Sequence, residues 1–405
     1  MIHFKDNILN QISILSGNPD TFSCNPVPAW NDERLRFLAE FSRYLLKKPN
    51  IRDFPDVMTF AYWCRKANLQ QMRKKETASG VIRHGLGLTF HVAPSNVPIN
   101  FAFSLVFGIL SGNSSIIRVS SEASPSRDYL VQSFQEILSL GAYAKISRSV
   151  LIVEYERSDE INAFFLKHSK ARIIWGGNET IKYMRGFEVP YRSREVVFSD
   201  RYSLSILDAL SVCQANDNAF KKLVEGLYND IYLMDQFACS SPQLVLWNGN
   251  HSEVEQAQER LWPALSKFAS QKYAIEPIQV MNKYVDICRK LSDLNNIEKF
   301  TRFSGALYVL KISTLQKEQH LIRAHSGTVI EYHLSSIEEL TKIVNDSYQT
   351  LTYFGLSKEY FSSVLMIAGL EGIDRIVPVG RAIEMDIWWD GYDIVPSLSR
   401  RIDIQ

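Results

Sequence analysis

The sequence predicts an α/β protein with a parallel sheet, and three features point to it. From residue 81 onward, apolar stretches of strand length alternate with segments whose apolar residues recur at helical spacing. The stretch 86–119 reads strand, helix, strand, which is a βαβ unit with a right-handed crossover. A chain of 405 residues is also too long for one simple core, so we expect two domains.

The composition describes an ordinary globular protein. Hydrophobic residues make up 46% of the chain, enough for a large interior. The formal charge of +1, from 45 basic and 44 acidic residues, gives no long-range field that would collect nucleic acid or an anionic membrane. We therefore expect a small, specific ligand and no nucleic-acid partner.

The cysteines and histidines argue against structural crosslinks. Five cysteines with irregular spacing and no Cys-x-x-Cys pair favour neither a disulfide framework nor a zinc site, and the histidines show no ligand spacing, so we expect no metal. The N-terminus lacks the order of a signal peptide. The most apolar run, Phe101 to Leu110, is too short to span a bilayer. These features predict a soluble, cytoplasmic protein with reduced thiols.

The expected elements of the first half begin with helices. Residues 1 to about 80 have apolar positions at helical spacing in two segments, 30–46 and 57–72. Alternation follows, with strands at 86–92, 115–119, 150–153 and 171–175 and helices at 101–110, 125–140, 160–167 and 179–185. The carboxyl ends of these strands form one rim, where ligands bind in open α/β sheets.

The second half continues with the same two kinds of segment. Strands are expected at 196–198, 203–207, 244–247 and 328–332, with strand-like pieces in 298–312, and helices at 220–231, 253–268 and, behind a capping pattern, 335–344. An Asp-Gly step at Asp390-Gly391 marks a turn. The pattern places a domain boundary near residue 210.

Cys239 lies in a polar loop, 234–243, between a helix-like and a strand-like segment. Such a loop can present a sulfur to a cleft, and the thiolate form is a strong nucleophile. The alternative is an ordinary buried cysteine, which behaves as a small apolar residue.

Asn96 stands between Pro94 and Pro98 in a stiff strand-to-helix loop. An amide held rigidly there can donate a hydrogen bond to an oxyanion, which needs a donor already in place. The alternative is that Asn96 only caps the following helix.

Two further features are candidates for binding phosphate or ribose. Gly176-Gly177-Asn178 follows a strand and opens a helix, a geometry that sets backbone N–H groups against a phosphate, although a plain tight turn explains it equally well. Arg118 stands at the exit of a strand, where it contacts a ribose or phosphate or is simply solvated.

Taken jointly, these segments resemble the aldehyde dehydrogenase superfamily and, within it, the acyl-CoA reductase family typified by LuxC. The general motifs are Pro94-Ser95-Asn96-Val97-Pro98, the segment Ser111 to Arg118, and Gln236-Phe237-Ala238-Cys239-Ser240-Ser241-Pro242-Gln243. The narrower LuxC-like signals are His91 to Pro98, Ile174 to Gly177, Phe198 to Ser203, Trp389 to Asp393, and Leu398-Ser399-Arg400. They run in the right order from about residue 85 to the end of the sequence.

The resemblance implies an aldehyde dehydrogenase-like architecture. A helical segment, 1–80, joins a Rossmann-like NAD(P)-binding domain, 81–210, and a catalytic domain, 211–380, precedes a tail, 381–405, that returns to the nucleotide-binding and oligomerisation region. The implied catalytic residues are Cys239 and Asn96. The implied cofactor-binding residues are Pro94, Ser95, Arg118, Ser121, Trp175, Gly176, Gly177 and Asn178.

Departures from the family pattern refine the expected chemistry. Hydrolytic aldehyde dehydrogenases carry a Glu-Leu-Gly-Gly segment whose glutamate activates water, whereas Val197-Phe198-Ser199-Asp200 offers none. A thioester on Cys239 would therefore be exchanged with another thiol. Ser121 stands where NAD-preferring relatives carry an acid, which leaves room for a 2′-phosphate near Arg118 and favours NADPH, although the adjacent Glu122 leaves NADH open. The segment Ala324 to Thr328 supplies no ribose-binding glutamate.

The resemblance thus implies NADPH-dependent reduction of an acyl thioester, on coenzyme A or a partner protein, to the aldehyde through an S-acyl-Cys239 intermediate. It further implies a homo-oligomer, an acyl-activating partner protein and long-chain acyl groups. Two alternatives stay open. One is an acyltransferase that uses Cys239 without hydride transfer, and the other is a non-catalytic subunit of an acyl-processing complex.

Overall fold

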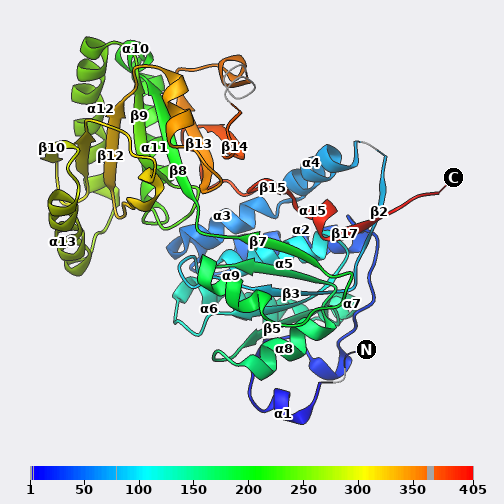
Figure 1. The fold of residues 1–405 in the computed structure, drawn as a ribbon. Coiled ribbons are helices and arrows are strands. Elements are labelled where there is room, and N and C mark those ends of the chain that lie inside the picture. Colours follow the sequence, from blue (N-terminus) through cyan, green and yellow to red (C-terminus); the bar gives the residue numbers. More distant parts are fainter. Residues whose placement is uncertain (1, 3, 79, 363–368, 405) are drawn as a thin grey trace. The chain divides into compact units, whose positions relative to one another are not determined.

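A computed structural model describes residues 2, 4–78, 80–362 and 369–404. It divides the chain into two compact units (Figure 1). Unit 1 comprises Met1–Ser199 and Met385–Gln405, and unit 2 comprises Asp200–Glu384. The chain therefore leaves unit 1 once, builds the whole of unit 2, and returns.

Unit 1 is built on a six-stranded sheet in the order β1-β5-β4-β3-β6-β7. Its strands are β1 (Ser13–Ser16), β3 (Leu88–Val92), β4 (Ser114–Val119), β5 (Val150–Glu154), β6 (Ala171–Trp175) and β7 (Arg194–Phe198). All neighbours are parallel except β1, which pairs antiparallel with β5. Since the chain order reverses on either side of β3, a ligand crevice is expected beyond the carboxyl end of this strand.

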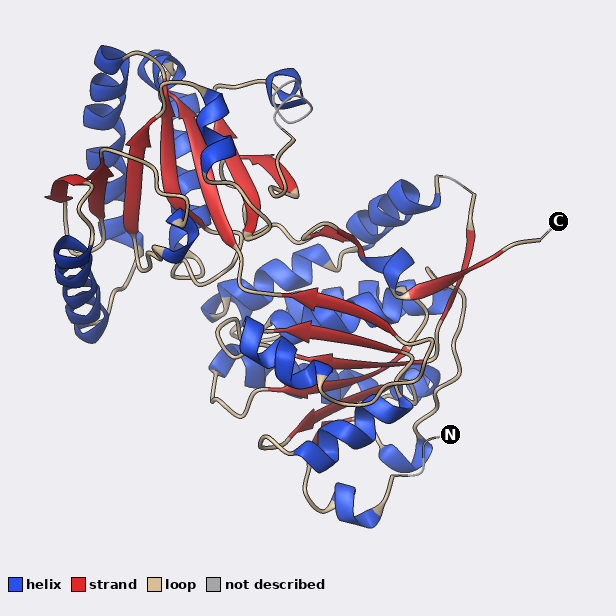
Figure 2. Cartoon of the chain, in the orientation of Figure 1, coloured by secondary structure: helices blue, strands red, loops and turns tan. Residues whose placement is uncertain are grey.

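Helices cover both faces of this sheet (Figure 2). The helices of unit 1 are α1 (Asp6–Leu9), α2 (Asp32–Lys47), α3 (Pro55–Trp63), α4 (Lys66–Thr77), α5 (Asn100–Leu110), α6 (Pro125–Leu138), α7 (Ala144–Ser147), α8 (Asp159–His168), α9 (Asn178–Arg185) and α15 (Ile394–Ser397). Apolar residues of α2, α3, α5 and α6 share one core cluster, and those of α8 and α9 share another. This double layer is why the strands read as continuous apolar runs.

The N-terminal region differs from expectation in two respects. The single helix expected at 57–72 is two helices, because Arg65 is extended (φ −63°, ψ 145°) and ends the helical path after the buried Cys64. A short strand, β2 (Ile82–Gly85), pairs antiparallel with β17 (Ser399–Ile402). Neither short strand was expected, because neither has the alternation of apolar and polar residues that predicts a strand. The expected turn at Asp390-Gly391 does join β15 (Trp388–Trp389) to β16 (Tyr392–Asp393), with φ of 53° and 76°.

Unit 2 contains a seven-stranded sheet in the order β10-β11-β12-β9-β8-β13-β14. Its strands are β8 (Tyr202–Asp208), β9 (Pro242–Asn248), β10 (Ile297–Arg302), β11 (Tyr308–Ile312), β12 (Thr328–His333), β13 (Tyr348–Phe354) and β14 (Arg375–Pro378). All neighbours are parallel except β10 with β11. The sequence pattern had grouped 203–207 with the first domain, but β8 pairs with β9 from Ser203 to Asp208, so the chain enters unit 2 before this strand.

Four helices of this unit are α10 (Ala209–Gln214), α11 (Asp217–Tyr232), α12 (His251–Lys272) and α13 (Pro277–Asp293). The capped α-helix expected at 335–344 is wrong in type, since Ile337–Lys342 forms a 3-10 helix whose N-cap, Ser336, makes no side-chain capping bond. The sequence reading also missed α13. Its apolar residues do recur at helical spacing, but they lie mostly on the exposed side of the helix, whereas Lys283 is buried.

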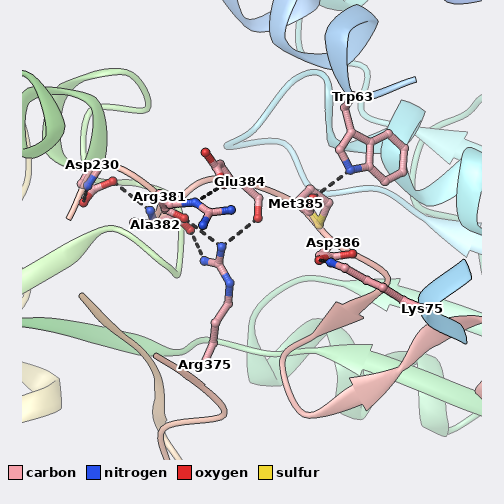
Figure 3. A network of polar contacts seen from close by, with 10 residues as sticks. Trp63, Lys75, Asp230, Arg375, Arg381, Ala382, Glu384, Met385 and Asp386 are labelled. Atoms are coloured by element: carbon pink, nitrogen blue, oxygen red, sulfur yellow. Dashed lines mark hydrogen bonds and ion pairs between the residues drawn. The ribbon is translucent and has the colours of Figure 1, made fainter. Parts of the chain in front are cut away.

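The segment that leaves unit 2 is anchored at both of its ends (Figure 3). Within unit 2, the buried Asp230 of α11 accepts hydrogen bonds from the backbone N–H groups of Gly380 (2.7 Å) and Ala382 (2.8 Å). Within unit 1, Trp63 Nε1 donates to the carbonyl of Met385 over 2.8 Å. Gly226 permits this close approach of the two backbones, because a Cβ on it would lie 3.1 Å from the Gly380 backbone, a tight contact.

Candidate active site

The Cys239 loop connects α11 to β9 and is fixed by the buried side chain of Gln236. This amide donates to the carbonyl oxygens of Pro242 (3.1 Å) and Thr328 (3.0 Å), and its oxygen accepts from the N–H of Gly327 (2.9 Å). Gln236 also adopts a left-handed backbone (φ 62°), an uncommon conformation that its side-chain bonds offset. The loop is thus tied to the start of β12.

A second buried glutamine completes this support. Gln243 donates through Nε2 to the carbonyl of Gln236 over 3.0 Å, and its Oε1 accepts from the N–H of Ala324 over 2.6 Å. The two amides therefore join the Cys239 loop to the loop before β12. Rigid support of this kind is what a nucleophile or an oxyanion donor requires.

Cys239 itself is partly exposed, unlike Cys64, which is completely buried. Its carbonyl oxygen accepts a hydrogen bond from Ser203 Oγ over 2.6 Å, and this hydroxyl accepts one from the N–H of Thr350 over 3.1 Å. The backbone at position 239 is therefore held by β8 and β13. The alternative of a cysteine sealed in the core does not apply to this residue.

Lys283 of α13 supports the loop before β12. This buried ammonium group donates to the carbonyls of Ala306 and Ser326 (2.8 Å each), with longer bonds to Gly305 and Gly327. Burial lowers the pKa of Lys283 to about 7. The sequence reading missed this residue, because a lysine in a helix is expected on the solvent side.

The ring of His325 extends the site toward the surface. It stacks on the exposed Phe237, with 6.2 Å between ring centroids, and lies 3.8 Å from a carboxylate oxygen of Asp286. Burial lowers the pKa of His325. At neutral pH this imidazole is therefore largely uncharged beside the Cys239 loop.

Asn96 lies in unit 1, in an exposed bend between β3 and α5. The helix begins at Asn100 with Ile99 at its N-cap, so Asn96 is not the capping residue and Pro98 precedes the helix instead of occupying its first turn. The N–H of Asn100 donates to the carbonyl of Val97 over 3.0 Å. The proposed oxyanion role of Asn96 stays a prediction.

A buried polar network underlies this bend. His91 contacts Ser104 Oγ through Nδ1 and Thr89 Oγ1 through Nε2, each over 2.8 Å, and Trp175 Nε1 donates to Ser104 Oγ over 3.0 Å. Burial lowers the pKa of His91 to about 3, so the imidazole is neutral. The network ties together the ends of β3 and β6, the two strands at which the chain order reverses.

A cavity of about 510 Å³ opens at these strand ends, on the side of α9. It is lined by Val92, Arg118, Arg157, Glu179, Thr180, Lys182, Tyr183, Met184 and Gly186. Three of these side chains are cationic, and the guanidinium of Arg157 lies 3.7 Å from the centre of the Tyr183 ring. Its volume is within the range of small-molecule sites, and its charge suits a nucleotide carrying phosphate.

Arg118 lines this cavity and is not a free strand end, and its contact with a ribose or phosphate stays a prediction. Its Nε and Nη2 donate to the carbonyl of Tyr155 (3.3 Å each), and its guanidinium lies 4.9 Å from the centre of that ring. The contacts fix the orientation of the cation. Arg157, Lys182 and Tyr183 were not anticipated, because nothing in the local sequence pattern marks them.

The other predicted cofactor residues are distributed differently. Pro94 and Ser95 line a second cavity of about 190 Å³, on the side of α5 and α6, and the exposed Ser121 lines neither cavity. The indole of Trp175 is buried and stacks on Phe198, with 3.7 Å between centroids. Gly177 is the N-cap of α9 and Asn178 its first residue, next to cavity residues Glu179 and Thr180; Gly176 immediately precedes them. Their direct contact with a cofactor stays a prediction.

No group of three or more His, Cys, Asp or Glu residues within the described ranges could hold a metal ion. Among the helices that the structure describes, none combines the length and apolarity needed to cross a bilayer.

Both sheets and their helix layers are those of the aldehyde dehydrogenases. A mutant form of the 1-pyrroline-5-carboxylate dehydrogenase of Thermus thermophilus superposes with a TM-score of 0.64 at 13% identity, covering 92% of this chain and 81% of that one. The oxidoreductase from Marinobacter aquaeolei gives the same TM-score at 13% identity, with 94% and 87% coverage. The chain therefore has the aldehyde dehydrogenase fold.

Sequence comparison defines the family within that fold. The profile described as "Acyl-CoA reductase (LuxC)" matches residues 29–401, and the chain belongs to this family. The long-chain acyl-protein thioester reductase of Aliivibrio fischeri is 28% identical over 186 residues, 45% of this chain and 37% of that protein. The corresponding protein of Vibrio harveyi is 23% identical over 312 residues, 73% and 58% respectively. The matched regions thus span about a third to three fifths of these relatives.

Proposed function

We propose that this protein reduces an acyl thioester to the aldehyde, with NADPH as reductant and Cys239 as the covalent nucleophile. The observation that carries the proposal is the partly exposed Cys239 on a loop clamped by two buried glutamines, in a chain of the acyl-CoA reductase family. The names of the acyl-protein thioester reductases support a thioester carried by a protein or by coenzyme A.

The first step is a transfer between thiols. The Cys239 thiolate forms a bond to the acyl carbon, the bond from this carbon to the donor sulfur breaks, and the donor thiolate takes up a proton. Asn96 and the N–H of Cys239 are assigned to the oxyanion of the tetrahedral species. The transfer conserves the thioester, so the energy of the activated acyl group is retained on the enzyme.

The second step is reductive. When bound, the nicotinamide supplies a hydride to the thioester carbon, which becomes a hemithioacetal on Cys239. Collapse of that species breaks the carbon–sulfur bond, releases the aldehyde and returns the cysteine thiolate. The net change consumes one acyl thioester, one NADPH and one proton and yields aldehyde, free thiol and NADP⁺.

The cavity beside α9 is assigned to the adenosine end of the cofactor. Arg118 and Arg157 provide cations there for a 2′-phosphate, and Tyr183 offers an aromatic surface. This arrangement supports NADPH over NADH. Unit 1 accordingly binds the dinucleotide, and unit 2 supplies the thiol.

The segment Val197-Phe198-Ser199-Asp200 supports reduction over hydrolysis. β7 ends at Phe198, and this segment has no glutamate where hydrolytic relatives place their general base. Without a base that activates water, an S-acyl-Cys239 intermediate persists until a hydride or another thiol reaches it.

The test is an assay with hexadecanoyl-CoA, NADPH and NADH that follows absorbance at the reduced nicotinamide band and traps aldehyde with a hydrazine. We expect NADPH oxidation and aldehyde in equal amounts, and radiolabelled acyl enzyme when the cofactor is omitted. Cys239→Ala should abolish labelling and turnover, whereas Cys24→Ala, which changes a partly exposed cysteine of unit 1, should keep both. Labelling without NADPH oxidation would favour the acyltransferase, and neither would favour the non-catalytic subunit.

A further inference from the structure

α13 of unit 2 has its apolar side on the outside. The helix buries Lys283 and Ile287, both with 0% exposure. On its outer side it exposes six apolar or weakly polar side chains, which we term the α13 stripe: Ile278, Met281, Tyr284, Val285, Cys288 and Leu291. At 100° per residue these positions fall on one continuous face. The five that are not cysteine are 40% to 64% exposed.

Burial of Lys283 fixes which side of the helix faces out. Its ammonium group is held by four backbone carbonyls and lies 4.2 Å from the centre of the Tyr308 ring. The helix cannot turn its apolar side inward without breaking these bonds. Figure 1 shows α13 at the margin of unit 2, near β10. The stripe is therefore presented by specific contacts, and exposed apolar side chains gathered on one face are typical of interaction sites.

The stripe belongs to the same unit as the proposed nucleophile. Two successive hydrogen bonds connect α13 to the loop that carries Cys239. Lys283 Nζ donates to the carbonyl of Ser326, and the N–H of Ser326 donates to the carbonyl of Asp235 over 3.0 Å, four residues before Cys239. Phe237, 52% exposed, adds an apolar side chain to the Cys239 loop itself. A protein bound to α13 therefore contacts the helix that also supports the loop carrying the thiol.

Charge indicates the chemistry of that protein. Apart from the buried Lys283, the stretch 277–312, which forms α13, β10, β11 and the loops between them, carries five Lys and Arg residues and three Asp and Glu residues. The whole chain, in contrast, has 45 of the first kind and 44 of the second. An acidic partner is attracted to this basic stretch and oriented by it.

The size of the stripe favours a transient partner over a permanent one. A helix of 17 residues is about 25 Å long, so a stripe about 10 Å wide offers roughly 250 Å². A stable homodimer buries about 800 Å² on each partner. The stripe alone is too small to hold a second copy of the chain, but it suits a carrier that must leave after each delivery.

We propose that the α13 stripe is the docking surface for an acidic protein that carries the acyl group as a thioester and delivers it to Cys239. This inference rests on the proposed function and names the partner of the same site. The spacing of Ile278, Met281 and Val285, at i, i+3 and i+7, is that of helices that insert into an apolar groove. The excess of Lys and Arg over Asp and Glu in 277–312 supplies orientation.

The experiment compares a protein donor with a small donor. Met281→Asp combined with Val285→Asp adds two negative charges to the stripe, and Asn282→Asp combined with Gln271→Asp adds the same charge at exposed positions outside it. An acidic acyl carrier protein loaded with a hexadecanoyl thioester and hexadecanoyl-CoA are the two donors. Binding of the fluorescently labelled carrier is measured separately from turnover, and light scattering gives the mass of each variant.

We expect the stripe variant to bind the carrier at least about tenfold more weakly than the control variant, and to lose kcat/KM with the protein donor while keeping it with hexadecanoyl-CoA. Equal binding by both variants would overturn the proposal, as would an equal loss with both donors or a halved mass of the stripe variant alone, which would assign the stripe to a second copy. If wild type turns over neither donor, the proposed function fails, while the binding measurement still decides the docking surface.

Discussion

Gln236 donates a hydrogen bond from its side-chain amide to the backbone carbonyl of Thr328, with 3.0 Å between nitrogen and oxygen. The bond joins a loop without regular structure to the first residue of a central strand. It makes the position of Cys239 depend on the sheet of unit 2 more than on the loop's own conformation.

Replacement of Gln236 by Ala should therefore loosen the loop. Three buried polar groups would lose their partner, at a cost of about 2 to 4 kcal/mol in the free energy of unfolding. Urea denaturation of the whole chain, followed by fluorescence, measures this change in the free energy of unfolding. The Gln271→Ala variant, at an exposed position, is the control. A variant as stable as wild type would show that the amide bonds do not hold the loop.

Lys283 should make the stability of unit 2 depend on pH. Its pKa of about 7 in the folded protein is below the value of about 10.5 in the unfolded chain, so the unfolded state binds more protons between these limits. Stability should rise with pH through this window, by at most about 1.4 kcal/mol per pH unit. Urea midpoints at pH 7 and 9 test this.

Lys283→Met should remove that rise, whereas the exposed Lys267→Met should leave it unchanged. An identical pH profile in wild type and Lys283→Met would contradict the assignment of the slope to this ammonium group.

Glu331 of β12 should prove important for packing α12 on the sheet. Its Oε2 accepts from the indole N–H groups of Trp247 (2.8 Å) and Trp262 (2.9 Å), all in the interior. Glu331→Leu leaves two buried donors without an acceptor, and we expect a loss of about 2 to 5 kcal/mol. Guanidinium unfolding measures it, with the exposed Glu259→Leu as the matched variant; equal midpoints would show that the indoles find other acceptors.

Arg157 should decide between the two nicotinamide cofactors. Removing its cation from the cavity beside α9 should weaken NADPH about tenfold and NADH much less, because only NADPH carries the 2′-phosphate. Calorimetric titration of Arg157→Ala with both cofactors measures this. Arg192→Ala, exposed and outside the cavity, is the control, and equal weakening of both cofactors would place the phosphate elsewhere.

The sequence predicted the parallel architecture well because the strands of unit 1 are buried on both faces. β4, β5 and β6 read as continuous apolar runs, and their helices carry clear periodicity. The position of the Cys239 loop was also predictable, since the segment from Gln236 to Gln243 is a local motif. The role of its two glutamines was not, because their partners Thr328 and Ala324 are far along the chain.

Other features depend on tertiary contacts that no local pattern reveals. β2 and β17 are short strands that pair across more than 300 residues, between Ser399 and Gly85 for example. Arg157 and Lys182 meet in one cavity only because α9 follows β6 at the reversal of strand order. Lys283 was missed since a buried lysine contradicts the usual burial rule, and α13 was missed with it.

The return of the chain at Met385 has a consequence for biosynthesis. When residue 384 has just left the ribosomal exit tunnel, the described strands of unit 2 have all emerged. At that point α15 and β17, the strand that pairs with β2 of unit 1, are still inside the ribosome. Unit 2, which contains Cys239, can therefore fold during synthesis before unit 1. Unit 1 is complete only when residues 385–405 have emerged.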